Sequence, residues 1–140
     1  MNAKIAEGRC LCGNIKFRVL GAPKWVGFCH CDSCRRATGG PVVTNVGFAD
    51  TDLTFTKGTP KIYGSSKGVK RGFCADCGTS LTYEAERFPD YVQVHLGAFD
   101  EPERFSPQAH VNCAEQISWF KIDDELPKYS HSAADESDDW

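Results

Sequence analysis

The sequence predicts a single domain built mainly from β-strands. Its 140 residues are about the length of one domain, and its 41% apolar and 25% charged residues are typical of a soluble globular protein. Short runs of alternating polar and apolar residues, rich in β-branched and aromatic side chains, recur along the chain. Gly and Pro separate these runs at intervals, and we find no internal repeat, long linker or second domain.

Five segments of this kind are predicted strands: residues 14–19, 42–48, 53–56, 80–83 and 91–96. In the last of them His95 falls on the polar face, so we expect it at the surface or in a groove. One helix is predicted over residues 32–38, where Asp32 is expected to cap the first turn and Gly39 and Gly40 to end the last.

Negative charge is concentrated at the C-terminus. The formal net charge is −3, and residues 130–140 contain four acidic residues with no Lys or Arg. This segment lacks apolar periodicity, so we predict a domain over residues 1–129 followed by a disordered acidic tail. The domain itself is nearly neutral, which argues against non-specific attraction of nucleic acid.

The chain has no predicted membrane-spanning segment, because no stretch approaches the roughly 18 unbroken apolar residues that a span needs. Residues 1–8 lack the apolar core of a signal peptide. We therefore expect a cytoplasmic protein without a membrane partner. In a reducing compartment, eight cysteines in a chain this short indicate metal or thiol chemistry rather than disulfides.

Seven of the eight cysteines fall in three clusters, a C-x-C pair, a C-x-C-x-x-C triplet and a C-x-x-C pair: Cys10 and Cys12; Cys29, Cys31 and Cys34; Cys74 and Cys77. The two pairs, each followed by Gly, together supply the four thiolates of a closed structural zinc site. The triplet supplies three thiolates and leaves one coordination position for water or a substrate thiol, as in catalytic zinc sites.

The spacing leaves the pairing of these clusters open. Cys31 and Cys34 could combine with the Cys74 pair, although the 39 intervening residues exceed the usual zinc-ribbon spacing of about 15 to 20. The triplet could also form a closed site completed by Cys113 or by a histidine. We favour a buried, inert thiol for Cys113.

The residues around the clusters make the chain similar to a known family. The runs GRCLCG (8–13), FCHCDSCR (28–35) and FCADCG (73–78) resemble the glutathione-dependent formaldehyde-activating enzymes, which are also known as the centromere-protein-V-type domain family. His110, Trp119 and the run LPKY (126–129) extend the resemblance, which covers residues 5–129. It implies the Mss4-like fold, in which β-sheets meet around zinc knuckles.

The resemblance also implies a function. It implies two zinc ions per chain. The structural ion is held by Cys10, Cys12, Cys74 and Cys77. The catalytic ion, where the thiol of glutathione arrives, is held by Cys29, Cys31 and Cys34. The implied activity is that of a carbon–sulfur lyase, which joins glutathione or a similar thiol to formaldehyde or another small aldehyde, as in S-(hydroxymethyl)glutathione synthase. The alternatives are a non-catalytic zinc-knuckle binding module and a glutathione carrier.

Three further residues near the triplet are candidates for supporting roles. Arg35 and Arg36 could donate hydrogen bonds to a developing alkoxide or to a glutathione carboxylate, although a solvated face is the commoner role of such a pair. His30 points away from the metal if the C-x-C segment is extended, so we predict a packing or ligand-orienting role for it.

Overall fold

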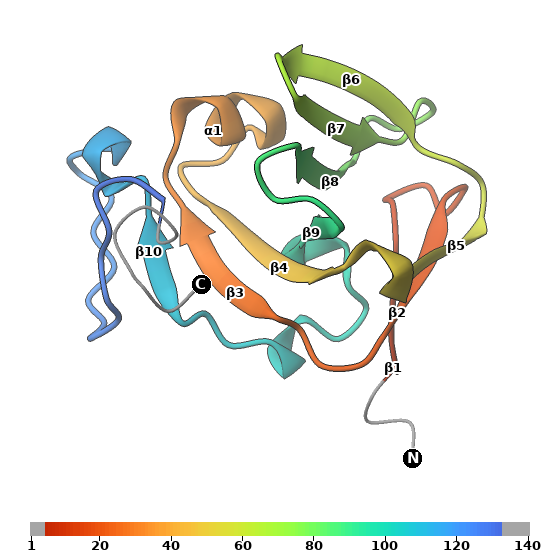
Figure 1. Ribbon diagram of the computed structural model, residues 1–140, viewed down its shortest axis with the longest axis horizontal. Coiled ribbons are helices and arrows are strands. Elements are labelled where there is room, and N and C mark those ends of the chain that lie inside the picture. Colours follow the sequence, from red (N-terminus) through yellow and green to blue (C-terminus); the bar gives the residue numbers. More distant parts are fainter. Residues whose placement is uncertain (1–4, 133–140) are drawn as a thin grey trace.

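The computed structural model describes residues 5–132, which form one domain with two β-sheets (Figure 1). The larger sheet has the strand order β10-β3-β4-β9-β8-β7-β6 and the smaller one the order β1-β2-β5. The strands are β1 (Ile5–Arg9), β2 (Lys16–Leu20), β3 (Trp25–Cys29), β4 (Val43–Ala49), β5 (Leu53–Lys57), β6 (Lys61–Ser66), β7 (Val69–Phe73), β8 (Ser80–Ala85), β9 (Tyr91–His95) and β10 (Ala109–Val111). The predicted mainly-β, single-domain fold is confirmed.

The helical elements are short, and most of them lie close to the end of a strand. They are the helix α1 (Asp32–Thr38) and the 3₁₀ turns η2 (Asp50–Asp52), η3 (Leu96–Ala98), η4 (Pro102–Arg104) and η5 (Cys113–Glu115). All strand pairs in the described chain are antiparallel except β10 with β3. Within residues 5–132, no helix has the length and apolar character needed to cross a membrane.

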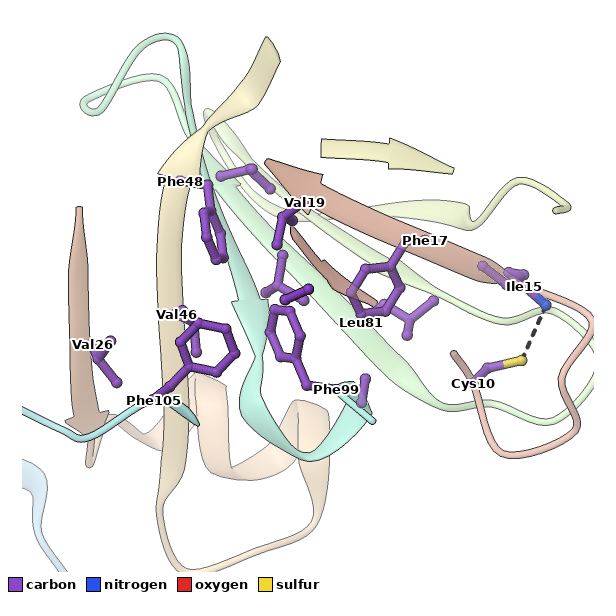
Figure 2. Close-up of a cluster of buried hydrophobic side chains, with 14 of the residues drawn as sticks. Cys10, Ile15, Phe17, Val19, Val26, Val46, Phe48, Leu81, Phe99 and Phe105 are labelled. Atoms are coloured by element: carbon purple, nitrogen blue, oxygen red, sulfur yellow. Dashed lines mark hydrogen bonds between the residues drawn. The ribbon is translucent and has the colours of Figure 1, made fainter. Parts of the chain in front are cut away.

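The main hydrophobic core lies between the two sheets (Figure 2). Phe17 of β2 and Phe48 of β4 are fully buried, and both rings contact Phe99, at centroid distances of 5.3 Å and 6.1 Å. Burial of each such side chain contributes about 1.5 to 3 kcal/mol. Cys10 and Cys74 belong to this core, whereas Cys29 and Cys34 pack in a second, smaller cluster. The fold therefore places the cysteine clusters in two separate regions.

The helix α1 follows β3 after a two-residue loop and covers the predicted residues (Figure 1). Its cap differs from the prediction, since Cys31 rather than Asp32 precedes the first turn. The Sγ of Cys31 accepts a hydrogen bond from the N–H of Cys34 at 3.2 Å. Gly39 ends the helix with a φ of 82°, a left-handed conformation that favours glycine. The capping atom is thus also a predicted metal ligand.

His95 lines a groove, which was one of its two predicted places, but it is not at the surface. Val92 and Val94 are buried as the alternation of β9 predicts, but His95 is only 6% exposed. It lies opposite Asn45 of β4, and the two side chains are joined by a hydrogen bond of 2.7 Å. A buried polar partner on the next strand therefore allows the histidine to enter the interior.

The predicted tail begins at Ser130, and residues 133–140 lie outside the described part of the chain. Residues 130–132 follow the domain surface. The N–H of Ala114 donates to the carbonyl of Ser130 at 3.1 Å, and the N–H of Asn112 donates to that of His131 at 2.8 Å. These backbone hydrogen bonds hold the start of the predicted tail against the loop after β10.

Candidate functional site

The four-cysteine cluster joins the two sheets. Cys10 and Cys12 follow β1 of the smaller sheet, and Cys74 and Cys77 follow β7 of the larger one. Their four sulfurs lie within 4.8 Å of one another, with 3.6 Å between Cys10 and Cys12 and 3.8 Å between Cys12 and Cys74. Four sulfurs at about 2.3 Å from one zinc ion would be about 3.8 Å apart. The cluster therefore fits a tetrathiolate zinc site, as counting the cysteine pairs predicts.

A glycine shapes each of the two loops that carry these cysteines. Gly13 and Gly78 have φ values of 80° and 79°, a conformation that favours glycine. Each donates its N–H back to the carbonyl of the first cysteine of its loop, at 3.1 Å to Cys10 and 2.8 Å to Cys74. The glycine after each pair is thus required by the turn that brings two sulfurs together.

Side chains also connect the two loops directly. The hydroxyl of Thr79 accepts from the N–H of Leu11 at 3.0 Å, and Asn14 Nδ2 donates to Asp76 Oδ2 at 3.0 Å. The same hydroxyl lies 3.1 Å from the Sγ of Cys77, and this hydrogen bond lowers the pKa of that thiol to about 5. The loops are therefore held in register, and one ligand is favoured as the thiolate that metal binding needs.

The three-cysteine cluster lies where β3 ends and α1 begins. Cys29 is the last residue of β3, Cys31 caps α1, and Cys34 lies in its first turn. Their sulfurs lie within 4.8 Å of one another, with 3.6 Å between Cys29 and Cys34. Asn112 Nδ2 donates to the Sγ of Cys29 at 3.3 Å. The spacing again matches ligands of one zinc ion, and the polar N–H groups around the sulfurs stabilise thiolates.

The three cysteines line a cavity of about 130 Å³. The remaining wall contains aromatic and hydrogen-bonding side chains, which include Trp25, Asn45, Arg71, Tyr83, Tyr91 and Gln93. No Asp or Glu is among the described lining residues. A small molecule in this cavity would therefore meet three sulfurs, positive charge and amide groups.

Arg71 of β7 is a charged group in contact with the three-cysteine cluster, and local sequence patterns do not predict it. The residue is only 8% exposed, and its Nη1 lies 3.7 Å from the Sγ of Cys34. Its Nε donates to Ser65 Oγ at 3.0 Å, and its guanidinium lies 5.1 Å from the ring centroid of Tyr83. These contacts fix a buried cation beside the triplet.

The three thiols differ in acidity because they share one small volume. Hydrogen bonds from Cys29 and Cys34 lower the pKa of Cys31 to about 2, and the charge of Arg71 acts in the same direction. The pKa of Cys29 is raised, because its thiolate would lie beside the sulfurs of Cys31 and Cys34 in a buried position. These opposite shifts favour a thiolate at Cys31 over one at Cys29.

Arg35 and Arg36 lie outside the residues that line this cavity. Arg35 donates to the carbonyl of His30 at 3.2 Å and to that of Glu115 at 3.0 Å, so it ties α1 to the C-terminal part of the chain. Arg36 is bound to Asp32 at 3.0 Å with a side chain that is 81% exposed. The solvated-face interpretation is confirmed for Arg36, whereas Arg35 contacts backbone carbonyls outside the cavity.

His30 is fully buried and is not among the residues that line the cavity, which agrees with the packing part of the role predicted for it. Its Nε2 lies 2.9 Å from His110 Nδ1, and His110 Nε2 lies 2.9 Å from Asp124 Oδ2. Phe28 stacks on the His110 ring at 4.8 Å. This chain of hydrogen bonds connects the cysteine loop to the segment around Asp124.

Cys113 is half-buried rather than buried, and it lies outside both clusters of the described chain.

Comparison with known proteins identifies the family. Residues 5–115 match the family described as glutathione-dependent formaldehyde-activating enzyme. The chain belongs to this family. A Halomonas elongata protein, whose name assigns it provisionally to the glutathione-dependent formaldehyde-activating enzymes, is 28% identical over 128 residues, which are 85% of this chain and 82% of the relative. An uncharacterised lyase of Schizosaccharomyces pombe is 27% identical over 127 residues, which are 84% of this chain and 92% of the relative.

A solved structure supports the fold of this family member. The crystal structure of a Rhodobacter sphaeroides protein superposes with a TM-score of 0.56 and 18% identity, covering 88% of this chain and 98% of the other. The resemblance stated from the cysteine motifs is therefore confirmed. At the level of the family, the function is glutathione-dependent activation of formaldehyde, and both cysteine clusters could hold metal ions.

Proposed function

We propose that this family member joins the thiol of glutathione to formaldehyde or a similarly small aldehyde at the Cys29, Cys31 and Cys34 cluster, as a carbon–sulfur lyase. The observation that carries the proposal is the difference between the two clusters. Three sulfurs line a cavity together with a buried arginine, whereas the four-cysteine cluster lies outside that cavity and already has a complete ligand set.

Both clusters have the donor chemistry of zinc sites. The four-cysteine cluster would hold a structural ion that braces the two sheets. Cys29, Cys31 and Cys34 would hold a second ion, which lowers the pKa of an arriving thiol when it is bound. The N–H groups of Cys34 and Asn112 stabilise the sulfurs of this second cluster whether or not the ion is bound.

The reaction needs a thiolate held beside an electrophilic carbonyl. The sulfur attacks the carbonyl carbon, a C–S bond forms, and the π electron pair of the C=O bond moves to oxygen, which takes a proton from water. Because glutathione and formaldehyde also combine unaided, the protein contributes position and charge stabilisation.

Arg71 provides the charge stabilisation in this proposal. Sulfur and alkoxide both carry negative charge during the addition, and a buried guanidinium near Cys34 stabilises that charge more strongly than water does. Asn45 and Gln93 supply further polar contacts within the cavity. The lining therefore suits a small carbonyl compound and the sulfur end of a thiol.

The test is the rate of adduct formation above the spontaneous background, measured with zinc-loaded protein. We expect saturable acceleration with glutathione and formaldehyde, and a return to the background rate in Cys31→Ser. Cys113→Ser is the matched control, because Cys113 lies outside both clusters, and this variant should keep the wild-type rate. A wild-type rate equal to the background would refute the proposal, even if glutathione binds, because the protein would then be a carrier.

A further inference from the structure

The cavity beside the three cysteines lies on the face of the larger sheet that is opposite the main core. Four adjacent strands supply polar lining residues whose side chains share this face: Asn45 of β4, Gln93 of β9, Tyr83 of β8 and Arg71 of β7. Val46 and Val94, which pair with each other at the alternate positions, belong to the main core instead. The sheet therefore presents a row of hydrogen-bonding groups to a molecule that binds beside the sulfurs.

Asn45 is a diagonal neighbour of Cys29 on this face. Its partner on β3 is Gly27, and Cys29 follows two positions later with its side chain on the same side of the sheet. Diagonal neighbours of this kind are about 7 to 8 Å apart, a separation that one small molecule can bridge. An aldehyde that meets a thiol at the three-cysteine cluster is therefore within reach of the Asn45 amide.

His95 fixes the direction of that amide. It lies opposite Asn45 on β9, and its Nδ1 donates to Asn45 Oδ1 at 2.7 Å, because an amide oxygen only accepts. Burial, and to a lesser degree the charge of Arg71, lowers the pKa of His95 to about 4, so the ring is neutral near pH 7. The neutral ring has one N–H, and this hydrogen bond uses it. The amide oxygen is thereby held toward the histidine, and the NH₂ group is directed elsewhere.

The amide nitrogen of Asn45 is available to a bound molecule. No hydrogen bond joins Nδ2 to another described residue, and Nδ2 is not among the described side-chain atoms that are buried without a partner. It therefore retains accessible surface. Asn45 as a whole is only 2% exposed and lines the cavity, so we place this accessible surface in the cavity. Two N–H donors of fixed direction thus face the space beside the sulfurs.

We propose that Asn45 is a catalytic residue of the reaction at the three-cysteine cluster and that His95 is its positioning residue. Nδ2 donates a hydrogen bond to the aldehyde oxygen, which gains negative charge as the C–S bond forms and the π electron pair of the C=O bond moves to it. The oxygen then takes a proton from water. A donor that is already oriented and buried stabilises this charge without reorganisation. The inference rests on the proposed function and adds a directional donor to the charge of Arg71.

The first test is the rate of adduct formation by zinc-loaded Asn45→Asp and Asn45→Leu. Asp keeps an oxygen for His95 but loses both N–H donors, and Leu removes the donors without adding charge. We expect kcat to fall by about 100-fold in both variants, with an unchanged KM for glutathione and an unchanged zinc content. Thermal unfolding of each variant shows that it is folded at the assay temperature.

Gln108→Glu is the matched control. It makes the same change from amide to carboxylate, and Gln108 Oε1 likewise accepts one hydrogen bond, from the N–H of Val26 at 3.1 Å, but the residue lies outside the cavity. This variant should keep the wild-type kcat. Wild-type kcat in both Asn45 variants would overturn the assignment while the proposed function stands. A wild-type rate equal to the spontaneous background would overturn both.

The second test separates positioning by His95 from a merely structural role. His95→Asn places an amide N–H close to where the ring Nδ1–H lies, whereas His95→Leu provides no donor. We expect kcat to fall by about tenfold in His95→Leu and to be restored in His95→Asn. A structural role would instead order the two variants by their melting temperatures. Equal kcat in the two variants would therefore contradict the role of His95.

Discussion

Arg71 Nη1 lies 3.7 Å from the Sγ of Cys34, although the two residues are 37 positions apart in the chain. The contact crosses from β7 in the larger sheet to the first turn of α1, and both residues are buried. A buried cation is costly unless anionic or polar groups surround it. The cluster of three thiols provides that negative charge, so the arginine and the cysteines stabilise one another.

Replacing Arg71 should therefore slow the reaction without removing the fold. We expect Arg71→Gln to lower kcat for adduct formation by about 100-fold, because the variant keeps hydrogen-bond donors but loses the positive charge. Arg71→Lys should recover part of the rate. The exposed Arg36→Gln serves as the control and should behave as wild type. Unchanged kinetics of Arg71→Gln would remove this residue from the mechanism.

The two cysteine clusters should respond differently to a single Cys→Ser substitution. Cys74→Ser breaks the ligand set that joins the two sheets, so the melting temperature should fall by about 10 °C or more. Cys31→Ser should abolish activity with a smaller loss of stability. Zinc analysis and thermal unfolding measure both effects, with two zinc ions per chain expected for the wild type. Equal destabilisation by the two substitutions would argue against separate roles.

His95 should make folding stability depend on pH. Its pKa is lowered from 6.5 to about 4 in the folded chain, mainly by burial, whereas the unfolded chain takes up the proton near 6.5. The contribution to stability is therefore complete above pH 6.5 and is lost as the pH falls toward 4, by up to about 3 kcal/mol. Urea unfolding of wild type and His95→Gln between pH 7 and 4 isolates this effect, because His95→Gln should show a shallower decline. Parallel curves would contradict it.

His110 should contribute to stability through its two hydrogen bonds. His110→Phe keeps the stacking on Phe28 but leaves His30 Nε2 and the Asp124 carboxylate without this partner. We expect the free energy of unfolding to fall by about 2 kcal/mol. Asp124→Asn retains an acceptor oxygen for His110 and should lose less. A larger loss in Asp124→Asn than in His110→Phe would show that the histidine is not the central link.

Local sequence patterns predict some strands with one buried face but not all of them, since β1 buries the small residues Ala6 and Gly8 rather than large apolar ones. β2 alternates exposed and buried residues, and its segment was recognised from that alternation. The strands β1, β3, β6, β7 and β10 were missed. Nearly every residue of β3 is buried and nearly every residue of β6 is exposed, so neither has a period of two to detect.

In the candidate site, too, local sequence patterns predict some of the residues and not others. The cysteine clusters are visible because their ligands are close in sequence, and the structure groups them as the family resemblance implies. Arg71 could not be predicted, because its place beside Cys34 depends on how β7 and the larger sheet lie against α1. The burial of His95 could not be predicted for a related reason, since only the pairing of β9 with β4 brings Asn45 opposite it. The positions of Arg71 and His95 therefore depend on contacts between segments that are far apart in the sequence, which local patterns do not predict.

Cobalt absorption spectroscopy tests the central claim most directly, because sulfur-to-cobalt charge-transfer bands report how many thiolates bind each ion. The chain is loaded with cobalt(II) in place of zinc and titrated with glutathione. We predict that glutathione increases the charge-transfer intensity by the contribution of one added thiolate in the wild type and in Cys113→Ser, and that Cys31→Ser loses this response. A spectrum that glutathione leaves unchanged would contradict the account, because the three-cysteine cluster would then have no position for an arriving thiol.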